Sequence, residues 1–341
     1  PALWLYFILI ITSMFFVTGA VGFVTAGFFE NLFGINYLGE WTVVILFITC
    51  VVILAIGKYN ALDSLIKIVA IVLLVSTVTA FILVLYNGPI EPVDGFIPKE
   101  LLTVSGLFFL LALMGWMPAP LEISSWNSLW TLERIKQSKY TPKLKETIFE
   151  FKLAYLITGI LAVMFVTLGS YMFFGSGQAL PNNNAQFANQ VVTLYTNTIG
   201  NWSHIIISAS AFAIMFGTII AVFDGYSRSL KRTIELLFTK NENIEGIKSR
   251  ILYVVILLII AIGSLVVIFQ FGDNLKTLVD FATVLSFVVA PIIAILNFRL
   301  VTGKFLPKIN HPSTIMKITS VAGIVFLIGF ALIFLIMKIT S

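Results

Sequence analysis

Long apolar stretches separated by short polar segments dominate the hydrophobic pattern of this chain. A helix needs about 20 apolar residues to cross the hydrocarbon core of a bilayer, and nine segments meet or approach that length. The alternating segments that are typical of membrane barrels are not seen. Because backbone groups in lipid must bond within their own segment, all nine segments are predicted to be helices. They are Trp4–Phe28, Trp41–Ile56, Leu62–Tyr86, Leu101–Trp130, Phe151–Phe174, Trp202–Phe223, Ile251–Phe271, Leu275–Phe298 and Ile315–Ile336.

Composition places the chain among integral membrane proteins. It is 59% hydrophobic and 11% charged, with a mean hydropathy of +1.03, whereas soluble domains are roughly 45–50% apolar and about 25% charged. The single cysteine, Cys50, excludes a disulfide framework and a cysteine metal site. The two histidines, His204 and His311, lie far apart near segment ends. The net charge of +5 is attributed to cytoplasmic loops, so no nucleic-acid partner is expected.

The distribution of Lys and Arg predicts the orientation of the chain. Of the 21 basic residues, 18 fall in one alternate set of loops and three in the other. Cytoplasmic loops carry the excess of Lys and Arg, so the first segment begins inside and the C-terminus ends outside. Arg228, Lys231 and Arg232 follow the sixth segment closely and are expected to anchor it to anionic lipid head groups.

The fourth segment is predicted to be interrupted. Leu101–Trp130 has 30 residues, too many for one straight crossing at about 1.5 Å per residue. Pro118 and Pro120 remove backbone donors, so carbonyl groups about one turn earlier lose their usual partners. The sequence therefore predicts one half-helix over Leu101–Met114 and a second from Leu121 to about Ser138. The stretch Gly115–Pro120 is expected to be unwound near the middle of the membrane.

An acidic residue follows this interruption directly. Discontinuous helices bind ions in many secondary transporters, where free carbonyls and half-helix ends meet. Glu122 lies in the first turn after the break, where a helix N-terminus favours an anion. Since a carboxylate in hydrocarbon is costly, Glu122 is predicted to be a substrate ligand or a proton carrier. The alternative is a plain proline kink in which a neighbouring helix satisfies Glu122. Asp280, in another apolar segment, is a second candidate, for an ion pathway or for a hydrated structural role.

Three short motifs, in order along the chain, resemble those of the Nramp family of divalent metal transporters. Met117-Pro118-Ala119, followed by Ser125, resembles that family's Met-Pro-His motif. Asn31-Leu32-Phe33-Gly34-Ile35 resembles the segment after its third helix, and Ala61-Leu62-Asp63-Ser64-Leu65 resembles the entry to its fifth. The order of the segments, their loop lengths and their orientation then match helices three to eleven of the family.

The resemblance implies an all-α polytopic membrane protein with the inverted-repeat fold of the leucine-transporter type. The chain is expected to form one transmembrane domain over residues 1–341. Residues 1–99 would complete the first repeat, residues 100–300 would form the second, and residues 301–341 would add a C-terminal helix. The first residue is Pro1, and the family's first two helices, which carry its metal-binding Asp and Asn, are expected to precede it.

The resemblance also implies a metal site at the broken helix. Met117 would supply a thioether and Met114 a backbone carbonyl, and Gly115 and Glu122 complete the candidate metal-binding set. A soft sulfur ligand selects transition metals over Mg²⁺ and Ca²⁺. The family histidine is Ala119 in this chain, and the paired acids of the family's third helix are Thr18 and Val21. Coupling to protons by the family's usual route is therefore in doubt, and Glu122, which the family pattern lacks, is a candidate substitute.

The sequence thus predicts a secondary active transporter of Mn/Fe-type divalent metal ions that works by alternating access. The alternative with the same fold is a symporter of an amino acid or another small organic solute. An intramembrane enzyme is disfavoured because the chain has no His-Glu-x-x-His or Gly-x-Ser-x-Gly motif. No cofactor is expected. The expected partners are the metal ion, as substrate, and membrane lipids. Whether protons are the coupling ion is left open. The expected location is the inner or plasma membrane of a bacterium.

Overall fold

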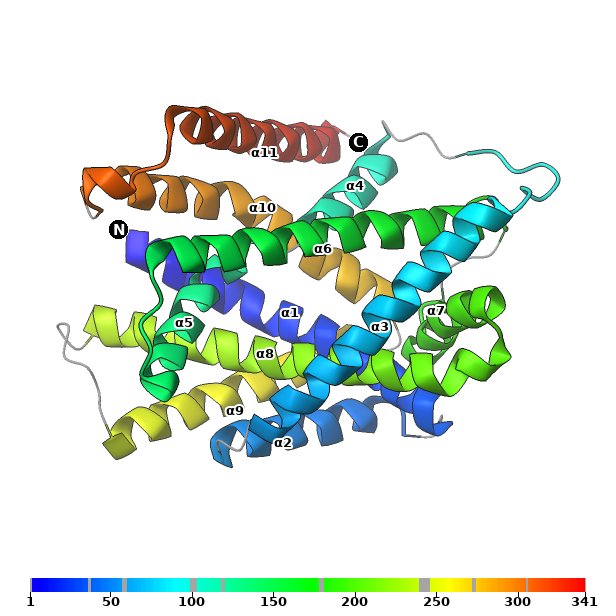
Figure 1. Ribbon diagram of the computed structural model, residues 1–341, viewed down its shortest axis with the longest axis horizontal. Helices are drawn as coiled ribbons and strands as arrows, with labels where there is room; N and C mark the ends of the chain where they lie inside the picture. Colours follow the sequence, from blue (N-terminus) through cyan, green and yellow to red (C-terminus); the bar gives the residue numbers. More distant parts are fainter. Residues whose placement is uncertain are drawn as a thin grey trace. The chain divides into compact units, whose positions relative to one another are not determined.

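The computed structural model describes residues 2–35, 38–56, 60–98, 103–117, 120–177, 181–238, 246–271, 274–304 and 306–340. Within these ranges the chain forms α-helices and short 3₁₀ helices and has no strand (Figure 1). The α-helices are α1 (Ala2–Phe33), α2 (Glu40–Ile56), α3 (Asn60–Asn87), α4 (Val104–Trp116), α5 (Ser124–Ser138), α6 (Leu144–Phe173), α7 (Asn184–Ile199), α8 (His204–Phe238), α9 (Gly246–Phe271), α10 (Leu275–Thr302) and α11 (Thr314–Thr340). The 3₁₀ helices are η1 (Leu121–Ile123), η2 (Asn201–Ser203) and η3 (Lys308–Asn310).

The predicted membrane segments are helical in the structure. Seven helical stretches of the described residues are long and apolar enough to cross a membrane, and the shorter apolar helices Glu40–Ile56 and Ile71–Asn87 fall in two further predicted segments. The class of all-α polytopic membrane protein is therefore confirmed. The inverted repeat and its boundaries at residues 99 and 300 stay predictions.

Two helical stretches were missed from the sequence. Helix α7 lies between the fifth and sixth predicted membrane segments, where no helix was predicted, and it buries Ala188, Val192 and Tyr195. These positions are spaced i, i+4 and i+7, so they form one face of a helix that is too short and polar to cross a membrane. Helix α8 continues well beyond the predicted end at Phe223, because Tyr226, Leu230 and other residues after it are buried at helical spacing.

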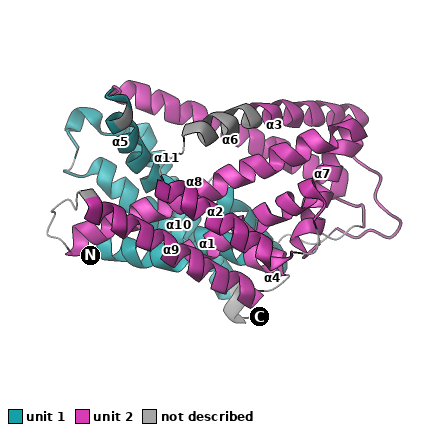
Figure 2. Ribbon diagram, turned by 90° about the horizontal axis from the view of Figure 1, so that it is seen from below, with its two compact units in different colours: residues 1–13, 99–141, 280–341 teal, residues 14–98, 142–279 magenta. Residues whose placement is uncertain are grey.

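The helices group into two compact units that are interleaved along the chain (Figure 2). The larger unit comprises residues 14–98 and 142–279. In it, α8 packs against α3, α7, α9 and α2, while α6 packs on α3. One of its apolar clusters joins α1, α3, α6, α7 and α8 through buried residues that include Phe28, Val84, Leu168, Val192 and Ile207. Packing between long apolar helices thus holds the larger unit together.

The smaller unit comprises residues 1–13, 99–141 and 280–341. It contains α4, α5, α11 and most of α10, and it holds the interrupted segment. Its apolar cluster joins α4, α10 and α11 through Leu107, Leu111, Phe287, Ala331 and Phe334. Helix α4 begins at an N-cap, Thr103, whose hydroxyl accepts a hydrogen bond from the backbone N–H of Gly106. The cluster therefore packs α4 against α10 and α11.

Candidate functional site

The fourth apolar segment is interrupted, as the sequence predicts. Helix α4 ends at Trp116, and Met117 is extended, with φ −109° and ψ 126°, while its N–H still bonds to the Leu113 carbonyl. Pro120 is extended as well, with φ −67° and ψ 139°, and it leads into η1 and then α5. Pro118, which was predicted to share in the break, and the neighbouring Ala119 lie outside the described residues.

The predicted start of the break was wrong by two residues, because Gly115 is helical and does not unwind. A Cβ atom on Gly115 would lie 2.0 Å from the carbonyl oxygen of Thr283 on α10. Only glycine permits two helix backbones to approach this closely at this point. The glycine at position 115 therefore serves the contact between α4 and α10, and the unwinding begins at Met117 with the prolines.

A hydroxyl group on α10 connects the two sides of the interruption. Ser286 is 2% exposed, and its oxygen accepts a 3.0 Å hydrogen bond from the indole Nε1 of Trp116, the last residue of α4. The same hydroxyl donates a 3.2 Å hydrogen bond to Oε1 of Glu122, in η1. One O–H group can accept and donate at once, so Ser286 fits both roles. The carboxylate of Glu122 is 8% exposed, which means that the predicted buried acid is indeed buried.

The start of α5 is held by two further polar contacts. Asn297 of α10 donates a 3.0 Å hydrogen bond from Nδ2 to the hydroxyl of Ser124. The phenol of Tyr6, near the beginning of α1, hydrogen-bonds to the hydroxyl of Ser125. Thr283, Ser286 and Asn297 are three and eleven residues apart, which places them along one face of a helix with 3.6 residues per turn. Polar contacts from α10 and α1 thus hold the beginning of α5.

The two methionines of the candidate set lie on opposite sides of the end of α4. The side chain of Met114 packs against the apolar cluster of α4, α10 and α11. Its carbonyl group is four residues before position 118, where proline has no N–H to donate. Met117 is half-buried at the first extended position. The predicted roles, a carbonyl ligand from Met114 and a thioether ligand from Met117, stay predictions.

Asp280 lies on α10, on the N-terminal side of the polar contacts around the break. It lies six residues before Ser286 on α10, which corresponds to about 9 Å along the helix axis at 1.5 Å per residue. It is half-buried, and its carbonyl accepts a hydrogen bond from the hydroxyl of Thr283. The role of Asp280 in an ion pathway therefore stays a prediction.

Sequence reasoning missed Trp116, Ser286 and Asn297 as parts of this site. Their signal in the sequence was weak, since single polar residues in apolar helices commonly bond within their own helix. Within the described ranges, no group of three or more His, Cys, Asp or Glu side chains is placed to hold a metal ion.

Comparison with known proteins identifies the family. The sequence model of the natural resistance-associated macrophage protein-like family, Nramp, matches residues 1–337. The chain belongs to the Nramp family. Family membership implies divalent metal ion transport and a transporter rather than an enzyme. It also agrees with the apolar helices in making the chain part of an integral, multi-pass membrane protein.

A relative from a bacterium matches nearly all of the chain. It is an uncharacterized protein of Pasteurella multocida (strain Pm70), 32% identical over 337 residues. The match covers 98% of this chain and 75% of the relative.

Proposed function

We propose that this Nramp protein binds its divalent metal ion at the interruption between α4 and α5 and moves it by alternating access. The observation that carries the proposal is the extended backbone at Met117, followed within five residues by a buried carboxylate, Glu122. Irregular backbone at membrane depth occurs where it is buried in protein or lines a water-filled cavity. A buried carboxylate beside such a break supplies the negative charge that a cation requires.

The chemistry of the donor groups supports a transition metal. Met117 offers a soft thioether, Glu122 a hard carboxylate, and Met114 a backbone carbonyl. Thioether ligands favour soft or borderline ions, whereas sites for Mg²⁺ and Ca²⁺ use oxygen ligands alone. A mixed set of this kind fits Mn²⁺ or Fe²⁺ as cargo and a still softer ion such as Cd²⁺ as a probe.

The contacts of α10 support movement at the break. Trp116, Glu122 and Ser124 are each hydrogen-bonded to a neutral side chain of α10. A net hydrogen bond contributes only about 0.5–1.5 kcal/mol, or about 1.5–3 when one group is charged. Replacement of one of these hydrogen bonds by a bond to the metal ion or to water therefore has a small free-energy cost. A site that opens alternately to the two sides of the membrane requires such a small cost.

The coupling ion remains a separate part of the proposal. The family's paired acids are Thr18 and Val21 in this chain, and both side chains are buried in α1. Neither side chain can gain or lose a proton near neutral pH, so this route cannot carry protons. Glu122 is the carboxylate closest in sequence to the break, and any proton linkage of the site is assigned to it.

The same-fold alternative, an amino-acid symporter, has no specific observation in its favour. The family match supports a metal ion as substrate instead. The proposed bacterial plasma-membrane location rests only on the resemblance to the family and on the bacterial relative.

The test is metal uptake by the full-length protein in liposomes that enclose a metal-sensitive dye. Met117→Ala should weaken Cd²⁺ uptake at least about tenfold, or ~1.4 kcal/mol, and should weaken Mn²⁺ uptake less, because only the soft ligand is lost. Met316→Ala is the matched control, since Met316 is 54% exposed at the start of α11. Equal effects of Met117→Ala and Met316→Ala would show that Met117 is not a metal ligand.

A second variant tests the carboxylate. Glu122→Gln keeps the shape and the contact with Ser286 but removes the charge, so uptake of both metals should fall. If uptake and its pH dependence were unchanged in this variant, Glu122 would be neither a ligand nor a proton carrier. If Glu122→Gln abolished uptake while Met117→Ala did nothing, the site would use oxygen ligands alone.

A further inference from the structure

The last part of the chain carries basic residues without any acidic ones. Asp280 is the final Asp or Glu of the sequence, and five Lys or Arg residues follow it. Four of these, Arg299, Lys304, Lys308 and Lys317, fall between the last turn of α10 and the first turn of α11. No acidic neighbour in the sequence neutralises them. This connection also belongs to the side of the membrane that the distribution of Lys and Arg predicts to be cytoplasmic.

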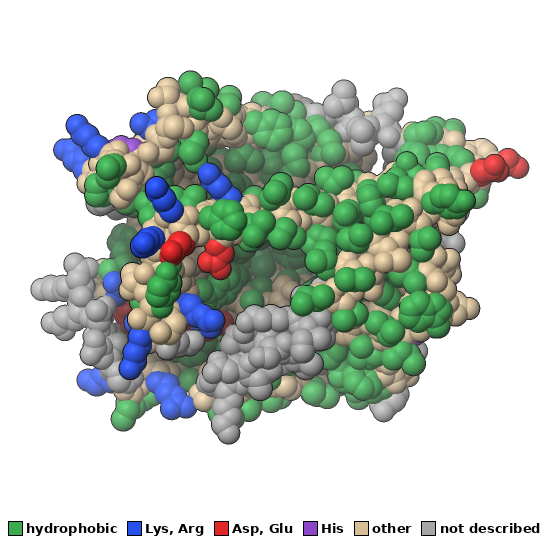
Figure 3. Space-filling view, in the orientation of Figure 1, with side chains coloured by type: hydrophobic (Ala, Val, Ile, Leu, Met, Phe, Trp, Pro, Cys, Tyr) green, Lys and Arg blue, Asp and Glu red, His purple; other side chains and the backbone are tan. Residues whose placement is uncertain are grey.

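Four residues of this connection, together with one isoleucine, form what we term the basic turn: Arg299, Lys304, Lys308, Ile309 and Lys317. Arg299, Lys304 and Lys308 are exposed, and Lys317 is half-exposed. Ile309 is 92% exposed, although it is a large apolar side chain beside Lys308. In Figure 3, blue side chains and a purple one are visible where α10 turns into α11, at the upper left.

The backbone of the basic turn is ordered by local hydrogen bonds. The N–H of Asn310 bonds to the carbonyl of Pro307 at 2.9 Å, and the N–H of His311 bonds to the carbonyl of Lys308 at 3.2 Å. The ring Nε2 of His311 also lies within hydrogen-bonding distance, 3.1 Å, of the Leu306 carbonyl. These bonds fix the backbone of η3, and this backbone conformation keeps the side chain of Ile309 exposed.

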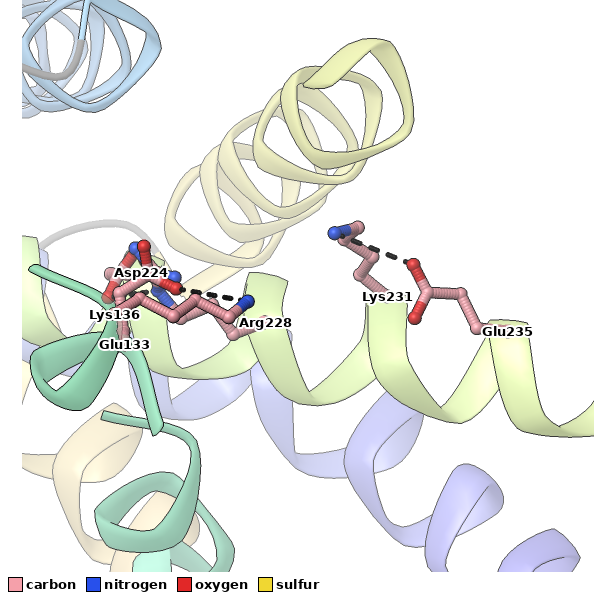
Figure 4. Close-up of polar contacts among 6 residues, drawn as sticks. All are labelled: Glu133, Lys136, Asp224, Arg228, Lys231 and Glu235. Atoms are coloured by element: carbon pink, nitrogen blue, oxygen red, sulfur yellow. Dashed lines mark hydrogen bonds and ion pairs between the residues drawn. The ribbon is translucent and has the colours of Figure 1, made fainter. Parts of the chain in front are cut away.

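The basic cluster at the end of α8 behaves differently. Arg228 pairs with Asp224 at 2.8 Å, and Lys231 pairs with Glu235 at 3.5 Å (Figure 4). Arg232 pairs with Glu235 as well, at 3.2 Å. The ring of Tyr253 on α9 adds a contact to the Arg228 guanidinium. These charges, which were expected to anchor the chain to lipid, are therefore largely neutralised by acids of their own helix. By contrast, none of the basic side chains of the basic turn forms an ion pair with the part of the chain that the structure describes.

We propose that the basic turn docks onto anionic phospholipid head groups of the cytoplasmic leaflet, with Ile309 inserted at the boundary between head groups and acyl chains. Cytoplasmic leaflets carry a negative surface potential that attracts clusters of Lys and Arg beside a membrane helix. An exposed apolar side chain next to basic residues is the pattern of interfacial insertion. The basic side chains account for the preference for anionic lipid, and Ile309 sets how deeply the turn enters the membrane interface.

The experiment uses the full-length protein with the substitution Ile309→Cys, labelled with a fluorophore and placed in nanodiscs. Cys50, the cysteine of this sequence, is buried and is not expected to take up the label; any other cysteine of the full-length protein is replaced by serine. Brominated phosphatidylglycerol and brominated phosphatidylcholine are compared as quenchers of the label. Stronger quenching by the anionic lipid, reduced by added salt because surface charges are screened, is the expected result.

Removal of charge from the turn gives the quantitative test. The double variant Lys304→Gln and Lys308→Gln should reduce the preference for the anionic lipid roughly thirtyfold, at about 1 kcal/mol for each basic residue. The control pair, Lys136→Gln and Lys139→Gln, removes the same charge at the exposed end of α5, where Lys136 lies beside Glu133. This control should keep the preference.

Two results would overturn the proposal. Equal quenching by the two lipids in the labelled protein would mean that the basic turn does not select anionic head groups. An equal loss of preference in the control pair would mean that only the total charge of the protein matters. Neither result depends on transport activity, so the proposal stands or falls independently of the metal site.

Discussion

Substitution of Gly115 by alanine tests whether the close contact between α4 and α10 supports the site. The added Cβ would lie 2.0 Å from the carbonyl oxygen of Thr283, and real Cβ atoms essentially never approach another atom closer than 3.0 Å. The obstructing atom belongs to the backbone, so α10 must move away by roughly 1 Å or more at this point. Ser286 lies one turn further along α10, and its bonds to Trp116 and Glu122 would lengthen with the same movement.

The size of the effect follows from two opposing contributions. Overpacking of a tight contact costs about 1–3 kcal/mol, and the weakened hydrogen bonds at Ser286 cost about 1–2 kcal/mol more. Alanine is a better helix former than glycine by about 1 kcal/mol, which offsets part of this. Gly115→Ala should therefore lower the free energy of unfolding by about 1–4 kcal/mol. It should also weaken any stabilisation by bound metal, because the site loses its support on α10.

The assay is thermal or denaturant unfolding of the full-length protein in detergent, with and without Mn²⁺ or Cd²⁺. Gly323→Ala is the matched control, because Gly323 lies inside α11 of the same unit and has no atom within 4 Å of the added Cβ. This control should leave stability unchanged or raise it by about 0.5–1 kcal/mol. The reasoning is refuted if Gly115→Ala is as stable as Gly323→Ala and shows the metal response of the unsubstituted protein.

Four further substitutions give distinct expectations. Ser286→Ala should lower the free energy of unfolding by about 2–4 kcal/mol, because it removes the hydrogen bonds to both Trp116 and Glu122. Trp116→Phe removes only the bond between Trp116 and Ser286, so its unfolding midpoint should fall less than that of Ser286→Ala. Thr18→Val should raise the unfolding midpoint, because the buried hydroxyl of Thr18 has no hydrogen-bond partner among the described residues. Burial of such a group costs about 1–3 kcal/mol of stability, so a lower midpoint would contradict the prediction. Tyr253→Phe should cost about 1–2 kcal/mol in chemical denaturation, because the phenol bonds to Asp224 at 2.6 Å, and an unchanged stability would show that Arg228 alone satisfies this carboxylate.

The interrupted helix shows how far local sequence can predict this fold. Proline lacks an N–H group and clashes with the preceding turn wherever it lies in a helix, so the break between α4 and α5 follows from Pro118 and Pro120 alone. The burial of Glu122 was predictable for a related reason, because the residues around it are too apolar to face water. What could not be predicted was the first extended residue, Met117 rather than Gly115, since that depends on a contact with Thr283, far away in the sequence.

Hydrophobic length alone determined the class of this protein and the number of its apolar segments, because each membrane crossing must satisfy its own backbone within a single helix. The same criterion overlooked α7 and the extension of α8, whose burial comes from packing on other helices and not from lipid. Family membership, too, was visible in short motifs of the sequence and needed no coordinates.

Only the tertiary structure decided what surrounds the break. Ser286 and Asn297 look like ordinary polar residues of an apolar helix, and their hydrogen bonds to Glu122 and Ser124 span more than 160 residues of sequence. Likewise, the sequence shows a cluster of positive charges in the second half of α8 and another after α10, but ion pairs neutralise most of the former cluster, whereas most of the latter is exposed. Pairings of this kind depend on which helix faces meet, and the linear order of residues does not carry that information.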